Sequence, residues 1–360
     1  MRAFLNPAVR RDEFRGLFAD DDYRDVRAFY SSRPQLQPTP LRDLRTVAGA
    51  LGIRALLAKD ETHRFGVNAF KIVGVEYAVH RLGGDAAGRG LVCATAGNHG
   101  RAVARVARER RIPCTVFVPA GRTADPLEHA TRAARVEAMR SDGARVIDVD
   151  GSYEEAVEQA AAFGKTSGAA VVSDTSWDGY EQIPRWIMAG YTHLLDEASR
   201  QWTTPPALVV VQAGVGGLVC AAASWFAWRF GTARPFFVVA EPDNAASLLA
   251  SARNGRAVTI AGPLDTIMAG LRCAEPSPVA WPAIAAGVDA FVTIPDAATI
   301  DAIQMMKAAP EGECIDAGPS GACGVAALGA IVRAPEMQQV RSAARLAPST
   351  RAMVIVTEGR

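Results

Sequence analysis

A lysine in an apolar segment is the side chain whose setting most clearly suggests chemistry. Lys71 follows Phe70 in the stretch FGVNAFKIVG, and apolar residues at helical spacing come after it. This pattern places the lysine near the start of a helix, where burial and the positive helix end both favour a neutral amine. Such an amine can form a Schiff base with an aldehyde. The alternative is a half-buried lysine whose stem covers apolar surface while its ammonium reaches water.

A glycine-rich turn could hold an anion. The stretch VVQAGVGGLV runs from an apolar strand through Gly214, Val215, Gly216 and Gly217 into a helix that begins near Leu218. Glycines let backbone N–H groups converge at a helix N-terminus, which attracts a phosphate. The spacing fits neither a Walker A loop nor a dinucleotide-binding fingerprint. A tight turn that binds nothing is the alternative.

Two further strand ends carry polar side chains. In CATAGNHGRA a strand turns into a helix, and its backbone donors could bind a carboxylate while Asn98 binds a phenolic oxygen. The alternative is an asparagine that only suits the turn conformation. His99 is interpreted as a support for this loop, with a role as base as the alternative. In MVIVTEGR a strand ends at Thr357, where ligands of open α/β sheets bind and a ring nitrogen could be met.

These four features match the parts of one cofactor. An aldehyde, a phosphate, a phenolic oxygen and a ring nitrogen occur together in pyridoxal 5′-phosphate, which the sequence therefore predicts as cofactor. The histidines lack the spacing of metal ligands, so no metal site is expected.

The elements that must position these side chains follow a regular alternation. Short apolar runs alternate with alanine-rich helical segments, which predicts an α/β fold with mostly parallel sheets in two layers. The predicted strands are 56–58, 91–94, 114–118, 145–149, 170–173, 208–212, 236–240, 290–294 and 352–356. Residues 119–131 and 310–320 are expected to be long loops.

Composition narrows the class of protein. The chain has 360 residues, of which 49% are hydrophobic, so it can bury a large core. Its 39 basic and 38 acidic side chains nearly balance, which argues against nucleic acid or a membrane as the main partner. The six cysteines form no CxxC pair and the first residues lack an apolar signal segment. A cytoplasmic enzyme with a small-molecule substrate is expected.

Several segments together resemble one family. FGVNAFKIVG, TAGNHGRAVA, DTSWDGYEQIPRWIMAGY, QAGVGGL, EPDNAASL and TIMAGLRCAEPSPVAWPAI are similar to segments of the diaminopropionate ammonia-lyases, which are fold-type II pyridoxal-phosphate enzymes like the tryptophan synthase β-subunit. The resemblance implies two doubly wound α/β domains in a homodimer. Residues 1–74 and 192–360 would form a larger cofactor-binding domain, and residues 75–191 a smaller inserted one, with the cofactor between them.

The resemblance also implies roles for single residues. Lys71 matches the lysine that carries the cofactor, Asn98 the residue at the phenolic oxygen, and Thr357 the position of the pyridine nitrogen. Asp174 matches an acid that is linked to the L-enantiomer of the substrate. The remaining cofactor-binding residues are Phe70, Gly214, Val215, Gly216, Gly217 and Leu218, and the substrate-binding residues are Thr95, Ala96, Gly97, His99 and Ser320.

The sequence departs from the family pattern in three ways. Ala96 stands where the family commonly has an aspartate that is linked to the D-enantiomer. Pro319, in AGPSG, stands where the family tends to have glutamate. In this respect the sequence resembles the dehydratases. The chain is also short for the family, so helices at the domain edge or subunit interface are expected to be missing.

The predicted reaction is α,β-elimination from L-2,3-diaminopropionate or a related β-substituted amino acid, giving a keto acid and ammonia. Lys71 and Asp174 are the predicted catalytic residues. The alternatives are β-replacement, as in cysteine synthases, and a serine or threonine dehydratase. A protein that keeps the fold but has no activity is the alternative outside enzymes.

Overall fold

The computed structural model describes residues 1–95, 97–120 and 126–360. Its internal contacts divide the chain into two compact units. The large unit comprises Met1–Arg64, Asn68–Phe70 and Tyr191–Arg360, and the small unit comprises Phe65–Val67 and Lys71–Gly190.

The large unit is built on a sheet that has seven strands within the described residues. Their order is β1 (Arg2–Leu5), β10 (Ala290–Ile294), β9 (Phe236–Pro242), β8 (Leu208–Gln212), β11 (Arg351–Val356), β3 (Ala55–Asp60) and β2 (Leu41–Asp43). The two edge strands pair antiparallel with their neighbours, and the inner pairs are parallel. Strands β3, β8 and β10 are buried along their whole length, as parallel strands covered on both faces are.

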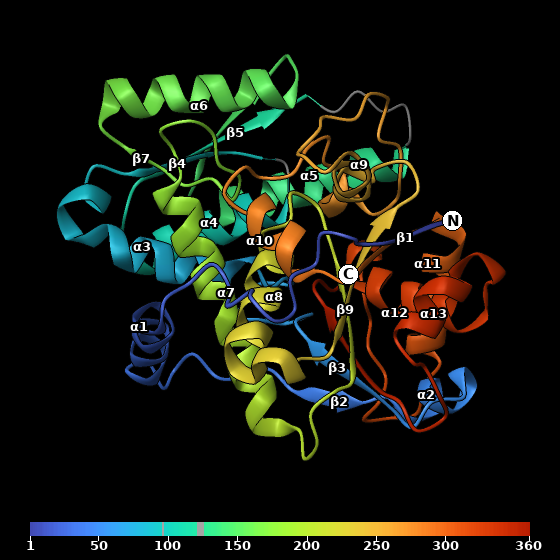
Figure 1. Ribbon diagram of the computed structural model, residues 1–360. Coiled ribbons are helices and arrows are strands. Elements are labelled where there is room, and N and C mark those ends of the chain that lie inside the picture. The colour runs from blue at the N-terminus through green and yellow to red at the C-terminus, as the bar shows by residue number, and fades with distance from the viewer. Residues whose placement is uncertain (96, 121–125) are drawn as a thin grey trace. The chain divides into compact units, whose positions relative to one another are not determined.

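Two apolar helices belong to the interior of this unit. The helices α8 (Gly217–Phe230) and α12 (Pro319–Arg333) are buried over most of their residues, which is typical of helices that are hydrophobic on every side. Helix α12 packs on the central strands, and α11 (Asp296–Lys307) and α13 (Gln338–Ala343) lie against it (Figure 1). The other helices are α1 (Asp20–Ser31), α2 (Arg45–Leu51), α9 (Ser247–Asn254), α10 (Trp281–Gly287) and the second part of α7 (Gln182–Gln201).

The small unit has a parallel sheet in the order β6 (Arg145–Val149), β5 (Cys114–Pro119), β4 (Leu91–Ala94) and β7 (Ala170–Val171). Helix α6 (Tyr153–Ser167) packs along β4 and β5 (Figure 1). The other helices are α3 (Lys71–Ala87), which is interrupted at Gly83, α4 (Asn98–Arg110), α5 (Pro126–Ser141) and the first part of α7. Each strand end in this unit therefore leads towards a helix start.

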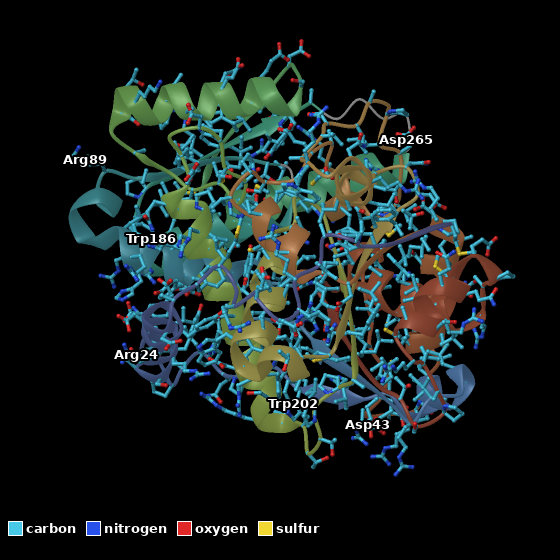
Figure 2. The ribbon with its side chains drawn as sticks, in the orientation of Figure 1. Arg24, Asp43, Arg89, Trp186, Trp202 and Asp265 are labelled. Carbon is cyan, nitrogen blue, oxygen red and sulfur yellow. The ribbon has the colours of Figure 1, made fainter. Side chains whose placement is uncertain are left out.

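Many charged side chains are exposed, among them the labelled Arg24, Asp43 and Asp265 (Figure 2). Among the described residues, no helix is long and apolar enough to cross a membrane.

Candidate active site

Lys71 is the first residue of α3, as its sequence pattern predicts. The residues that follow it, Ile72 and Val73, are fully buried and anchor the start of the helix, while the lysine side chain is 22% exposed. Its Nζ donates a short hydrogen bond to Oδ2 of Asp174. The sequence pattern favours a neutral amine, but the structure gives the lysine a carboxylate partner, which favours the ammonium.

Asp174 lies just after β7, in the loop that leads towards α7. Tyr180 fixes this segment, because its hydroxyl donates to the Val171 carbonyl (2.8 Å) and accepts the Ser173 N–H (2.9 Å). Burial by itself raises the pKa of Asp174, but the Lys71 ammonium, and after it His99, lower this pKa well below its usual range. The structure therefore holds an ionised carboxylate against the lysine.

His99 is the second residue of α4 and is 6% exposed. Its Nε2 lies 2.8 Å from the Val172 carbonyl oxygen, and its Nδ1 lies 3.9 Å from Oδ2 of Asp174. Burial lowers the pKa of His99, the Asp174 carboxylate raises it, and the Lys71 ammonium lowers it again; the net direction is down. Lys71, Asp174 and His99 thus form one cluster in the small unit.

The loop between β4 and α4 carries further predicted residues and belongs, like the cluster, to the small unit. Thr95 Oγ1 accepts the N–H of Gly97, which is the N-cap of α4, at 3.0 Å. Asn98 begins the helix. A Cβ at Gly100 would lie 2.7 Å from Thr95 Cγ2, so the close turn requires glycine there. The predicted substrate-binding residue Ala96 lies outside the described residues.

In the large unit, Gly214–Leu218 forms the connection from β8 to α8. Gly216 has φ +94°, and a Cβ on it would lie 2.4 Å from Ile284 Cδ1. A Cβ on Gly214 would lie 3.0 Å from both Cys273 Sγ and the Gly270 carbonyl oxygen. Within the described residues, the N–H groups of Gly214–Leu218 meet no protein acceptor. The loop is therefore a concave row of free N–H donors at a helix N-terminus.

Thr357 follows β11 directly and is 4% exposed. Its Oγ1 accepts a hydrogen bond of 2.9 Å from Nε2 of Gln212, the last residue of β8. The same amide nitrogen donates to the carbonyls of Ile355 (2.9 Å) and Ser320 (3.0 Å). These three acceptors fix the orientation of the Gln212 amide. The Thr357 hydroxyl accepts from Gln212, so its own proton is available to an acceptor, and the described residues offer none.

Gln212 is a residue that the sequence reasoning missed. It joins the ends of β8 and β11 to the start of α12, and two of its acceptors belong to the predicted residues Thr357 and Ser320. One signal was present in the sequence, because Gln212 is the polar end of an otherwise apolar, buried strand.

Ser320 and Phe70 also belong to the large unit. Ser320 Oγ accepts the N–H of Gly270 at 3.1 Å, and its own N–H donates to Glu358 Oε1 at 3.0 Å. Phe70 donates its N–H to the Thr357 carbonyl (3.1 Å), and its ring packs at 4.8 Å from that of Tyr191. The large unit thus gathers the glycine loop, Ser320, Thr357 and Phe70.

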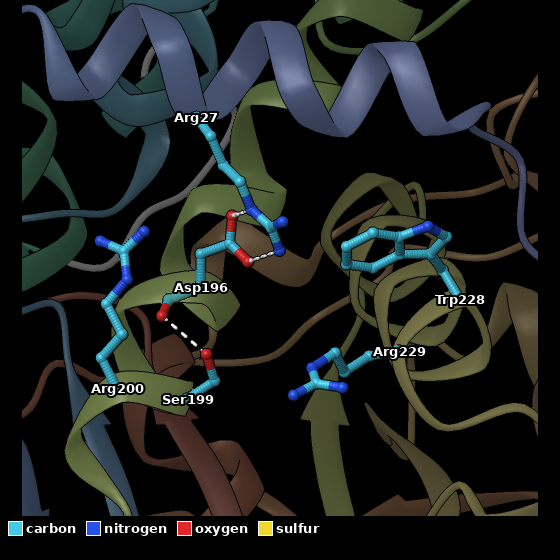
Figure 3. A pocket seen from close by; sticks show the side chains of 6 residues that line it. All are labelled: Arg27, Asp196, Ser199, Arg200, Trp228 and Arg229. Atoms are coloured by element: carbon cyan, nitrogen blue, oxygen red, sulfur yellow. Dashed lines mark hydrogen bonds and ion pairs between the residues drawn. The ribbon is translucent and has the colours of Figure 1, made fainter.

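A pocket of about 580 Å³ in the large unit contains none of the predicted site residues (Figure 3). Arg27 binds Asp196 there through two hydrogen bonds of 2.7 and 2.8 Å. Arg200 and Arg229 lie in the last turns of α7 and α8, where a cation complements the helix dipole. The helix dipoles thus favour Arg200 and Arg229, and the Asp196 carboxylate balances Arg27. Among the described residues, no group of His, Cys, Asp and Glu could hold a metal ion.

Comparison with known proteins decides the family. A family model described as "Pyridoxal-phosphate dependent enzyme" matches residues 33–357. Diaminopropionate ammonia-lyase from Escherichia coli K12 is 31% identical over 366 residues, which cover 95% of this chain and 89% of that protein. This chain belongs to the diaminopropionate ammonia-lyase family of pyridoxal-phosphate dependent enzymes. The corresponding protein of Salmonella typhimurium is 32% identical over 365 residues, covering 93% and 88% of the two chains.

Solved structures agree with membership of the diaminopropionate ammonia-lyase family. The crystal structure of the Escherichia coli enzyme "in complex with aminoacrylate-PLP azomethine reaction intermediate" superimposes with a TM-score of 0.86 at 30% identity, covering 99% of this chain and 93% of that one. The predicted α/β fold of the fold-type II pyridoxal-phosphate enzymes is thereby confirmed, as are the predictions of an enzyme and of its cofactor.

The residues of this diaminopropionate ammonia-lyase family member fit pyridoxal phosphate on three counts. The free N–H groups of Gly214–Leu218 suit a phosphate, and the turn that carries them has no room for a Cβ at Gly216. The Thr357 hydroxyl has a proton for a ring nitrogen. Lys71 offers a primary amine at the start of a helix.

Proposed function

We propose that this enzyme eliminates the β-substituent of L-2,3-diaminopropionate, or of a related β-substituted L-amino acid, and yields pyruvate or the corresponding keto acid and ammonia. The observation that carries this proposal is the short hydrogen bond between Lys71 and Asp174, which pairs an amine with an ionised carboxylate. The names of the relatives from Escherichia coli and Salmonella typhimurium support the choice of substrate.

On this proposal, the predicted cofactor-binding residues hold pyridoxal phosphate. Lys71 would hold its aldehyde carbon, Gly214–Leu218 would bind the phosphate, and Thr357 would donate a hydrogen bond to the pyridine nitrogen. Asn98 binds the phenolic oxygen and Phe70 contacts the cofactor. The proposed division remains a cofactor-binding domain of residues 1–74 and 192–360 with an inserted domain of residues 75–191.

Bound pyridoxal phosphate withdraws electrons from the Cα of the amino acid attached to it, so that the Cα proton and the β-substituent can leave. The residues of this chain supply the proton transfers and the orientation. Asp174 Oδ2 takes the Cα proton of the L-enantiomer, and Lys71 Nζ donates or accepts a proton next to it. Thr357 donates to the ring nitrogen without protonating it, which limits charge delocalisation and suits elimination. Thr95, Gly97, His99 and Ser320 are the proposed contacts of the substrate, and Ala96 completes this set.

Ala96 motivates the proposed preference for the L-enantiomer. The family commonly has an aspartate at this position, linked to removal of the proton from the D-enantiomer. A methyl group cannot accept a proton, whereas Asp174, on the side of the L-enantiomer, is retained. The same change makes the site less negative and would allow substrates of a different charge.

The deciding experiment measures keto acid and ammonia formed from the separate enantiomers of 2,3-diaminopropionate, and from a series of other β-substituted amino acids. We expect turnover of the L-enantiomer and at least about 100-fold less of the D-enantiomer, the effect of losing one positioned base. Equal turnover of both enantiomers contradicts the stereochemical proposal. Supplying thiols or amines separates elimination from β-replacement, because replacement gives a stable adduct that mass spectrometry detects.

A dehydratase is the second candidate, and Pro319 favours it. Pro319 is the first residue of α12, next to Ser320, in place of the glutamate that the family tends to have. L-Serine and L-threonine belong in the same substrate series for this reason. A higher kcat/KM for either of them than for L-2,3-diaminopropionate would decide for the dehydratase.

The quaternary structure and cellular location are also proposals. The family resemblance supports a homodimer, and a location in the cytoplasm is the expectation from the sequence. Light scattering coupled to gel filtration tests the first, since a dimer has twice the 38.1 kDa of the chain. Fractionation of cells that produce the protein tests the second.

A further inference from the structure

The cluster around Asp174 contains a second proton acceptor. His99 lies in the interior of the small unit, and its Nδ1 is buried and has no hydrogen-bond partner among the described residues. A buried polar atom without a partner normally costs free energy, so it calls for an explanation. Oδ2 of Asp174 lies 3.9 Å from Nδ1 and offers the explanation.

The position of the imidazole proton follows from the other ring nitrogen. Nε2 lies 2.8 Å from the Val172 carbonyl oxygen. A carbonyl can only accept, so Nε2 carries the proton and Nδ1 carries a lone pair. This lone pair faces an ionised carboxylate, which has no proton to donate. Nδ1 of His99 and Oδ2 of Asp174 therefore form no hydrogen bond for as long as Asp174 is ionised.

Protonation of Asp174 changes this relation. A carboxylic acid has an O–H to donate, and the Nδ1 lone pair is an acceptor 3.9 Å from Oδ2, the oxygen that Lys71 also contacts. The charged and titratable groups that face His99 are Asp174, whose carboxylate attracts a proton to the ring, and Lys71, whose ammonium repels one. The Cys93 thiol and the Tyr180 hydroxyl, also near Asp174, are kept neutral by burial, which raises the pKa of both groups.

We propose that His99 Nδ1 takes over the proton that Asp174 acquires from the substrate. The Asp174 O–H bond breaks as the N–H bond at Nδ1 forms, which restores the carboxylate and leaves an imidazolium. The proton returns by the same path when the departing amine requires it. This role rests on the proposed function, since it needs Asp174 to act as a base. His99 acts through Asp174 and is a positioning and proton-holding residue, besides supporting the loop.

Two variants separate proton transfer from loop support. In His99→Gln, the side-chain amide can still donate to the Val172 carbonyl, but no basic nitrogen remains. In Tyr180→Phe, the two hydrogen bonds that fix the strand end before Asp174 are lost, while His99 stays. The measurements are kcat and kcat/KM of the wild-type holoenzyme and both variants from about pH 5 to about pH 9, which spans the histidine range.

We expect His99→Gln to lower kcat by about 100-fold at neutral pH, the size of one proton-transfer contribution. Below the pKa of His99, which is lower than the ordinary histidine value, the wild-type ring is already protonated. The ratio of wild-type to variant kcat should therefore fall towards one as the pH is lowered. Tyr180→Phe should lower kcat at all pH values without this convergence. A constant ratio for His99→Gln means that the residue only supports the loop, and overturns the proposal.

A second readout does not depend on turnover. Nitrogen-15 NMR of the His99 ring should show the proton on Nε2 in the wild-type protein. Asp174→Asn should lower the pKa of His99, and Lys71→Ala should raise it, because these variants remove opposite charges. A proton on Nδ1, or a titration that neither variant moves, overturns the inference. If these shifts appear but no β-substituted amino acid is turned over, the proposed function is wrong and the Asp174–His99 pair stands.

Discussion

The proton affinity of Asp174 depends on one neighbouring cation. Burial raises its pKa, and the Lys71 ammonium is the main cause that lowers it. Any bond that turns this ammonium into a neutral nitrogen removes the stabilisation of the carboxylate. Asp174 then binds a proton more strongly, so engagement of Lys71 would make the carboxylate a stronger base.

Replacement of Asp174 tests this role at the residue scale. Asp174→Asn should lower kcat for the L-substrate by about 10² to 10⁴, because the amide cannot accept the Cα proton. The absorbance of the bound cofactor should persist, since Lys71 is unchanged. Asp178→Asn is the matched control, because Asp178 lies exposed in the same loop, and it should keep its activity. Equal losses in both variants would mean that the loop, and not the Asp174 carboxylate, matters.

Replacement of Thr357 tests the proposed hydrogen bond between its hydroxyl and the pyridine nitrogen of the cofactor. Thr357→Val keeps the shape of the side chain but removes the hydroxyl that Gln212 orients. We expect pyridoxal phosphate to bind about 10-fold more weakly, the effect of one hydrogen bond. Thr357→Ser keeps the hydroxyl and should bind like the wild type. Titration of each protein with the cofactor, followed by absorbance, gives the comparison; equal affinities for Thr357→Val and the wild type would remove the proposed contact.

The site residues differ in how well the sequence alone predicts them. Lys71 stood out because it interrupts an apolar segment at a helix start, and the structure places it there. Asp174 was found only through the family resemblance, since nothing local marks an acid in a loop as the partner of a lysine 103 positions earlier. Gln212 was missed because its importance comes from three chain segments that meet at its amide.

At the scale of elements, the turn from β8 to α8 depends on glycine. Gly216→Ala should cost about 1 to 2 kcal/mol of backbone strain at φ +94° and push Ile284 aside. We expect a loss of cofactor affinity of at least about 10-fold, because the N–H donors of Gly214–Leu218 would move. Gly52→Ala is the control, since Gly52 ends α2 at φ +68° with open space around it. A similar strain there should leave cofactor binding unchanged.

All nine predicted strands are present, although β7 is limited to Ala170–Val171. Most of them are apolar runs bounded by turns, which are characteristic of buried parallel strands, whereas the edge strand β6 is only partly apolar. The strands β1 and β2 were not predicted. Both are short, half-exposed edge strands, so their sequences RAFL and LRD lack an apolar run. The predicted loop 119–131 is partly wrong, since α5 begins at Pro126. Proline suits the first turn of a helix, and in this sequence it was interpreted as a loop signal.

At the scale of the molecule, the large unit contains a buried ionic cluster that no sequence pattern shows. Arg64 binds Glu61 and Glu197, each at 2.6 Å, and Lys59 binds Glu197 at 2.7 Å. Arg64 and Glu197 are 133 positions apart, so only the completed fold joins them. Removing one member would leave buried charge without a partner, which is strongly destabilising. The cluster thus ties β3 and the segment after it to α7.

Glu241 is a second buried acid, and the Arg2 guanidinium lowers its pKa less than its backbone partners do. Its carboxylate accepts the N–H groups of Leu248 and Leu249, both at 2.8 Å, at the start of α9. Burial raises the pKa of Glu241 to about 8, although these N–H groups lower it. Between the ordinary value for glutamate and about 8, the folded protein holds a proton that the unfolded chain releases. The stability supplied by this group is therefore complete at low pH and is lost as the pH rises to about 8.

The stability of the whole chain should record this titration. We expect the wild-type protein to have a lower Tm at about pH 9 than at about pH 6, because ionisation of Glu241 places a charge at a fully buried site. In Glu241→Gln the side chain stays neutral and its one oxygen can still accept one of the two N–H groups of α9. The lost bond lowers Tm at both pH values, but the difference in Tm between the two pH values should shrink. The contributions of the other titrating groups are common to both proteins, so they cancel when the two differences in Tm are compared. If the two proteins lose the same number of degrees, Glu241 is already neutralised or solvated, and the pH dependence of stability has to come from other groups.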